Sequence, residues 1–280
     1  MAANFTILCP IDFSNCSLNA LEYASKIGEK YQARLIVFHV LNKQDYQKIA
    51  PLDLEGHFQL EFVNQKLKQL QEAVLRESVP NGLEDCVIEI SEGPIVQRTL
   101  EFSQKVNANL LVVGTEGMND FKEQVFGSRS SKLVMQTDRD ILVIPRKVYF
   151  KRPRKLVYAT DYVEEDKVAI QKVVEFARFF DSEIDIVHVS SRSRVIDKAL
   201  HKNMTEEIKP FVNYELVNYV LKSFRDDLAL GLENYLQLAK GDMLVTLSKK
   251  KDFFDQLFAK NLSRKMSYFL TKPFWVIKSS

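Results

Sequence analysis

The stretch that decides the fold is FTILCPIDFSNCSLNALEYASKIGEKYQARLIVFHVLN, residues 5–42. Two short apolar runs rich in β-branched residues, Thr6–Ile11 and Leu35–Val40, flank a segment whose apolar residues recur every three or four positions. The two runs predict buried strands, and the segment between them predicts an amphipathic helix. A helix that joins two such strands is typical of a parallel crossover, because parallel strands cannot be joined by a tight turn.

The same pattern recurs in the second half of the chain. The matching stretch is RKLVYATDYVEEDKVAIQKVVEFARFFDSEIDIVHVSS, residues 154–191. Asp161 stands in the place of Asp12 and His188 in that of His39, each 149 residues further along. An internal match of this length indicates a duplicated unit.

A second pair of segments also matches, residues 109–146 and 242–279, at a separation of 133 residues. We therefore predict two domains, residues 1–148 and 152–280. The segment between Pro145 and Lys155 is rich in Lys and Arg, but no aromatic or helical motif extends it, so we expect a solvated linker rather than a nucleic-acid contact.

Each copy alternates strands and helices throughout. In the first, further apolar runs occur at Val87–Ile90, Leu110–Val113 and Ile141–Ile144, with helical spacing between them. The fold class predicted is therefore α/β, with two tandem doubly wound parallel five-stranded sheets of Rossmann-like type. The nearly continuous apolar character of the strands agrees with burial on both faces of a sheet.

Composition excludes several classes of protein. The chain has 280 residues, 46% of them hydrophobic, and a formal net charge of +2, which is typical of a soluble globular protein and gives no reason to expect a nucleic-acid partner. The N-terminus has no signal-peptide pattern, and no apolar run approaches the ~18 residues of a membrane span, so we expect a cytoplasmic protein without membrane contact. Cys9, Cys16 and Cys86 have no metal-site spacing, and we expect buried thiols.

The candidate binding loop is GTEGMNDFKEQVFGSRSS, which begins at Gly114 directly after an apolar run. This loop and the turn that contains Asp12 both follow strands, and ligands of doubly wound sheets bind at the carboxyl ends of strands. The segment after Ser128 has helical spacing, so its first amides would face a bound phosphate. Taken alone, the glycines fit a structural turn as well as a phosphate loop.

The spacing of these glycines resembles the nucleotide motif of universal stress proteins: Gly-x-x-Gly, nine residues, then Gly-Ser. The PIDFS sequence of Pro10–Ser14, the pair His39-Val40 and the closing ILVIP are also similar to that family. The resemblance implies a strand order of 3-2-1-4-5 and, for two-domain members, a pseudo-dimer of the two halves. It further implies a site for ATP or another adenine nucleotide, with a divalent cation such as Mg²⁺ on the phosphates. The residues that the resemblance assigns to this site are Pro10, Asp12, Val40, Gly114, Gly117, Gly127, Ser128 and Arg129.

The second copy departs from this motif. Leu247, Lys250, Lys260 and Asn261 stand where the first copy has Gly114, Gly117, Gly127 and Ser128. We therefore expect a degenerate second domain without the phosphate site. Because that copy keeps the flanking strand and helix, we also expect the glycines to serve a ligand rather than the fold.

Several residues support more than one interpretation. Asp12 is either a nucleotide contact or a turn residue that caps the first helix, and Glu116 is either a general base or an ordinary loop residue. His39 and His188 are expected to be repeated packing residues at strand ends rather than catalytic groups or metal ligands.

No kinase, Walker, zinc or triad motif is found, so we expect no catalytic residue, no metal ligand and no enzyme activity beyond slow ATP hydrolysis. The function predicted is nucleotide binding with a stress-response or regulatory role, with a protein partner or a homodimer as a further possibility. The alternative is an interaction scaffold of the same fold that binds no nucleotide.

Overall fold

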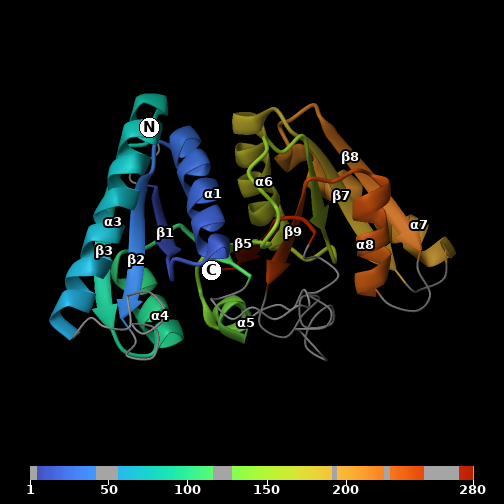
Figure 1. Cartoon of the computed structure of the whole chain (residues 1–280). Coiled ribbons are helices and arrows are strands. Elements are labelled where there is room, and N and C mark those ends of the chain that lie inside the picture. Colours follow the sequence, from blue (N-terminus) through green and yellow to red (C-terminus); the bar gives the residue numbers. More distant parts are fainter. Residues whose placement is uncertain are drawn as a thin grey trace. The chain divides into compact units, whose positions relative to one another are not determined.

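The computed structural model describes residues 5–41, 56–115, 128–190, 194–223, 228–248 and 271–279. The chain divides between Phe150 and Lys151 into two compact units (Figure 1). No helix of the described ranges is long and apolar enough to cross a membrane.

The first unit is a parallel sheet whose described strands lie in the order β3-β2-β1-β4-β5. Its elements are β1 (Thr6–Pro10), α1 (Asn15–Tyr31), β2 (Arg34–Leu41), α3 (Gly56–Ser78), β3 (Asp85–Glu92), α4 (Ile95–Lys105), β4 (Leu110–Gly114), α5 (Ser128–Gln136) and β5 (Asp140–Ile144). The predicted alternation and the predicted strand order of 3-2-1-4-5 are both confirmed.

The helices of the first unit cover both faces of its sheet. α1 packs against α3, and α4 packs against α5 (Figure 1). Crossovers are right-handed, so those that run in opposite directions along a sheet place their helices on opposite faces. The central strands are therefore covered twice, which explains why Ile7, Leu8 and Leu111 have no exposed surface.

Strand order reverses between β1 and β4. From β1 the chain moves outward through β2 and β3, and then returns to the other side of β1 with β4. Ile7 pairs with Leu110 and Leu8 with Leu111 in this central parallel contact. The carboxyl ends of β1 and β4 thus form the switch point at which doubly wound folds bind ligands.

The second unit repeats this architecture. Its strands lie in the order β8-β7-β6-β9-β10, and each described pair is parallel. Its elements are β6 (Lys155–Ala159), α6 (Asp166–Phe180), β7 (Glu183–Ser190), α7 (Arg194–Ile208), β8 (Val217–Ser223), α8 (Leu228–Leu238), β9 (Met243–Ser248) and β10 (Phe274–Lys278). Leu156 pairs with Met243 here as Ile7 pairs with Leu110 in the first unit, so the sequence repeat is also a repeat of strand register.

Candidate functional site

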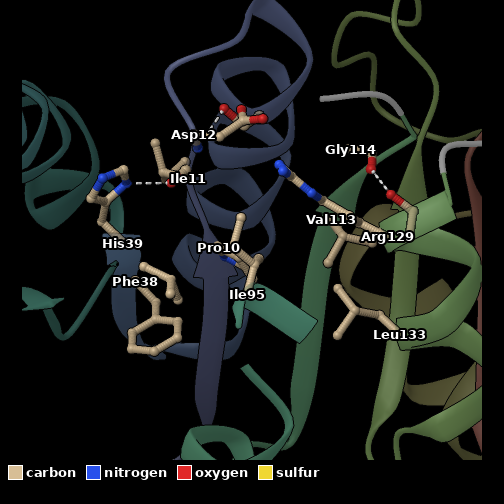
Figure 2. Close-up of a pocket in the computed structure, with 13 residues that line it drawn as sticks. Pro10, Ile11, Asp12, Phe38, His39, Ile95, Val113, Gly114, Arg129 and Leu133 are labelled. Carbon is tan, nitrogen blue, oxygen red and sulfur yellow. Dashed lines mark hydrogen bonds between the residues drawn. The ribbon is translucent and has the colours of Figure 1, made fainter. Parts of the chain in front are cut away.

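A hollow lies in the first unit at the switch point between β1 and β4 (Figure 2). It measures about 650 Å³, including the part that is open to solvent. Its lining comes from β1 and the turn after it, from α1, from the end of β2, from the start of α4, from the end of β4 and from α5.

The turn after β1 forms one wall of the hollow. Asp12 Oδ1 accepts a hydrogen bond of 3.0 Å from the Ser14 amide, and Phe13 between them has a left-handed φ of 62°. Ser14 is the N-cap of α1, because its Oγ accepts from the Ser17 amide at 3.1 Å. The helix-capping role considered for Asp12 therefore belongs to Ser14, while Asp12 closes the turn with one carboxylate oxygen.

His39 holds this turn against the end of β2. Its Nδ1 atom lies 2.7 Å from the carbonyl oxygen of Ile11, and its ring lies 5.1 Å from that of Phe13. A carbonyl oxygen only accepts, so Nδ1 carries the hydrogen and donates. In the second unit, His188 Nδ1 lies 2.9 Å from the carbonyl oxygen of Thr160. The prediction that both histidines are strand-end packing residues agrees with these contacts.

The opposite wall is formed by β4 and α5. Ser130 Oγ donates a 2.6 Å hydrogen bond to the carbonyl oxygen of Gly114, which joins the first turn of α5 to the end of β4. Arg129 is exposed on the same turn and also lines the hollow. Leu133, four residues after Arg129 and so on the same face of the helix, adds apolar surface.

The structure brings together part of the set of site residues predicted from the sequence. Pro10, Asp12, Val40, Gly114 and Arg129 line one hollow although they come from three strands, the turn after β1 and a helix. Ser128 is the first residue of α5 and is exposed, but it is not part of the lining. The remaining predicted residues, Gly117 and Gly127, and the alternative base Glu116 lie outside the described residues.

Several lining residues were not predicted from the sequence. They are Ile11, Ser17, Phe38, His39, Ile95, Val113, Ser130 and Leu133. Most are apolar and belong to strand ends or first helical turns, where they are indistinguishable from core residues by pattern alone. Ile95 had one usable signal, since it directly follows Gly93-Pro94 and begins α4; Pro94 is the N-cap of that helix.

Gly114 has a packing reason to be glycine. A β-carbon at this position would lie 2.7 Å from Cys16 Sγ and 2.8 Å from the Cys16 carbonyl oxygen, which real β-carbons do not tolerate. The expectation that the fold does not need the glycines is therefore wrong for Gly114. In the second unit Leu247 takes its place, and α6 begins at Asp166, two residues later in the repeat than α1 does at Asn15.

The equivalent positions of the second unit are occupied by a network of its own side chains. Asp166, which replaces Ser17, accepts hydrogen bonds from Thr160 Oγ1 at 2.6 Å, from the Val163 amide at 2.9 Å and from the Tyr158 hydroxyl. Burial raises the pKa of the Asp166 carboxyl above its ordinary value, although these three donors favour the ionised form. The second unit therefore has a buried acid near Asp161 where the first unit has Ser17, in addition to the lost glycines.

All three cysteines are buried free thiols, as expected. Burial raises the pKa of the Cys9 thiol and raises that of Cys86 to about 12, so both stay protonated. Among the residues that the structure describes, no group of three or more His, Cys, Asp or Glu side chains could hold a metal ion.

The comparison with known families agrees with this geometry. A model of the universal stress protein family matches residues 4–145, the unit that contains the hollow. The chain belongs to the universal stress protein family. The match ends one residue after β5, so it covers the whole alternation of strands and helices from β1 to β5.

Individual universal stress proteins are similar to this chain over one unit. Universal stress protein MJ0531 of Methanocaldococcus jannaschii is 26% identical over 153 residues, which span 53% of this chain and 83% of that protein. Universal stress protein MJ0577 of the same organism is 22% identical over 156 residues, spanning 50% of this chain and 94% of that protein.

The similarity to solved structures extends over both units. The crystal structure of a universal stress protein from Archaeoglobus fulgidus has a TM-score of 0.74, 18% sequence identity and coverage of 98% of each chain. At this identity the likeness concerns the fold alone, and it extends to the second unit.

Proposed function

We propose that the first unit binds ATP or a related adenine nucleotide in the hollow between β1 and β4. The observation that carries this proposal is the composition of the lining: apolar surface from Phe38, Val40 and Ile95, with one carboxylate at Asp12 and one guanidinium at Arg129. A planar base suits the apolar part, hydroxyl donors suit a carboxylate, and an anion suits a guanidinium. An adenine nucleotide carries all three.

The position of the hollow supports the same ligand class. Phosphates are commonly bound at helix N-termini, and α5 begins beside the hollow with Ser128 and Arg129. Family membership and the Gly-x-x-Gly spacing of the sequence are consistent with this ligand.

A divalent cation would come with the nucleotide rather than with the protein. The described lining offers one carboxylate, Asp12, and one of its oxygens already accepts from the Ser14 amide. Mg²⁺ prefers six oxygen ligands and keeps several waters, so phosphate and water oxygens would complete its coordination.

The repeat provides a matched control for the binding experiment. Asp12→Asn keeps the oxygen that accepts from the Ser14 amide but removes the charge, whereas Asp161→Asn makes the same change at the equivalent position of the second unit. Titration calorimetry with ATP and Mg²⁺ is expected to give saturable binding to the wild type, affinity reduced about tenfold in Asp12→Asn, and no change in Asp161→Asn. Absence of saturable heat at millimolar nucleotide would contradict the proposal.

We infer a regulatory binding role rather than catalysis. Within the described lining, His39 donates its Nδ1 hydrogen to Ile11 and Asp12 is held in its turn, so neither is arranged as a base beside a nucleophile. Intact ATP recovered after long incubation with the protein would support this role, and rapid release of ADP would contradict it.

A scaffold that binds no nucleotide is the second candidate. It is favoured by one observation: the glycine at Gly114 is explained by the proximity of Cys16, without any ligand. Mass spectrometry of small molecules released on denaturation separates the two functions, because a scaffold would release none.

A further inference from the structure

The repeat makes α4 and α8 equivalent helices. Ile95 and Leu228 begin them, and Lys105 and Leu238 end them, so every residue of α8 lies 133 positions after its counterpart in α4. α4 packs on β2, and α8 packs on the equivalent strand β7 (Figure 1). Because the two helices share their length, register and supporting strand, their outward faces can be compared residue by residue.

The outward face of α8 has lost the charges of its counterpart. Leu238 is 82% exposed and Leu230 is 37% exposed. Single exposed leucines are common, but these two share one helix face that in α4 is polar and charged. The exposed residues are Gln97, Glu101, Gln104 and Lys105 in α4, and Leu230, Asn234, Gln237 and Leu238 in α8.

The neighbouring helix of the same unit does not cover this face in the first copy. α4 packs against α5, and its four outward residues are nevertheless exposed. The two units have equivalent strand orders and registers. We therefore expect the apolar face of α8 to be covered by another molecule.

The arrangement on this face is symmetric about Asn234. Leu230 lies four residues before it and Leu238 four residues after it, so the three side chains form one ridge along the helix. A two-fold axis through Asn234 would place Leu230 opposite Leu238 of the partner subunit and would bring the two carboxamides together. A carboxamide both donates and accepts, so it can pair with its own copy, whereas Glu101 at the equivalent position of α4 would repel its copy.

We propose that the chain associates with a second copy of itself through the α8 face formed by Leu230, Asn234 and Leu238. The contact is isologous, since the same patch serves on both molecules. It needs no nucleotide, so it holds or fails independently of the proposed function. One helix face is small beside the ~800 Å² per partner of a stable interface, so the dimer is weak and depends on concentration.

A variant that copies the first unit tests the face. Leu230→Gln combined with Leu238→Lys gives α8 the residues that α4 has, and Leu216→Gln is the control, since it removes a leucine that is 48% exposed outside α8. Sedimentation velocity from micromolar to millimolar protein is expected to show a growing dimer fraction for the wild type. The double variant should weaken association about 100-fold or more, and the control should change it by less than about twofold.

Cross-linking tests the symmetry axis without altering the leucines. Asn234→Cys and Glu101→Cys introduce thiols at equivalent exposed helix positions of the two units, and the three native cysteines are buried. A short bis-maleimide is expected to link two copies of the Asn234→Cys protein and to link few copies of the Glu101→Cys protein.

Each alternative result would overturn the inference. A wild type that stays monomeric at every concentration would do so, as would a double variant that dimerises like the wild type. Equal loss in the Leu216→Gln control would indicate general surface hydrophobicity instead of the α8 face. If the double variant does not fold, the cross-linking pair decides, and equal linking of the two cysteine variants would place the contact elsewhere.

Discussion

A β-carbon on Gly114 would lie 2.7 Å from the Sγ atom of Cys16, at the point where the N-terminus of α1 approaches the end of β4. The carbonyl oxygen of Cys16 would be almost as close, at 2.8 Å. Because the second contact is with backbone, a rotation of the cysteine side chain would not relieve it.

Gly114→Ala is therefore expected to destabilise the protein without any ligand present. Overpacking of this kind costs about 1–3 kcal/mol, which urea unfolding followed by circular dichroism would detect. Cys16→Ala combined with Gly114→Ala should recover only part of the loss, since the carbonyl contact remains. A Gly114→Ala variant as stable as the wild type would contradict the packing explanation.

The difference between the two units predicts a stoichiometry. We expect the second unit not to bind a phosphate, because Leu247 stands in place of Gly114 and the buried Asp166 in place of Ser17. Titration with ATP is expected to saturate at about one nucleotide per chain. Two equivalents per chain would mean that the second unit binds nucleotide despite these substitutions.

The hydroxyl of Tyr162 makes a contact that Phe13, the equivalent residue of the first unit, cannot make: it is hydrogen-bonded to Nδ1 of His201 on α7. The ring of Tyr162 stacks on His188 at 4.4 Å, as that of Phe13 lies 5.1 Å from His39. Tyr162→Phe removes the hydroxyl and is expected to cost about 0.5–1.5 kcal/mol. The chain's one tryptophan, Trp275, lies in β10 of the same unit, and its ring centroid is 5.4 Å from that of Phe176. Its fluorescence therefore reports the unfolding of the second unit.

The exposed Tyr149 is the control for this variant, since it lies outside the second unit. Tyr149→Phe should change the unfolding free energy by less than about 0.5 kcal/mol. Equal effects of the two substitutions would argue against a specific role of the contact between Tyr162 and His201.

His201 predicts a pH dependence of stability. Burial lowers the pKa of His201, and the nearby His188 lowers it further. The unfolded chain therefore takes up the proton first as pH falls, so the stability that neutral His201 contributes is complete above its ordinary pKa of 6.5 and is lost below it. His201→Asn keeps an acceptor for Tyr162 but does not titrate.

Trp275 fluorescence during urea unfolding at pH 7.5 and pH 5 would measure this effect. Relative to His201→Asn, the wild type is expected to lose stability at the lower pH. A constant difference between the two proteins across this range would show that His201 titrates alike in the folded and unfolded chains.

Much of the fold could be predicted from hydrophobic runs, because burial on both faces gives strands a strong signal. The runs at Leu110–Val113 and Ile141–Ile144 lie within β4 and β5. The strand order was predicted from the family resemblance, because hydrophobic runs do not show which strands pair with each other in the sheet. The close approach of Cys16 to Gly114 could not be predicted, since it depends on where α1 begins relative to the end of β4.

The site could be predicted only in part, for a similar reason. Asp12 and Gly114 stand out because their residue types and places after strands are unusual. Leu133 and Phe38 do not stand out, since apolar residues at such positions more often belong to the core. Of the two roles considered for Asp12, helix capping belongs instead to Ser14, two residues later, which accepts the capping hydrogen bond.

The histidine that holds the turn after the first strand can help to recognise duplicated copies of this domain in a sequence. The bond from His39 to Ile11 and that from His188 to Thr160 join a side chain to backbone, and the residue after each aspartate keeps a left-handed φ, 62° at Phe13 and 59° at Tyr162. Because the partner atom is a carbonyl oxygen, the bond is present although Thr160 stands where the first unit has Ile11. An aspartate followed 27 residues later by a histidine can therefore mark a diverged copy of this domain after its ligand motif has been lost.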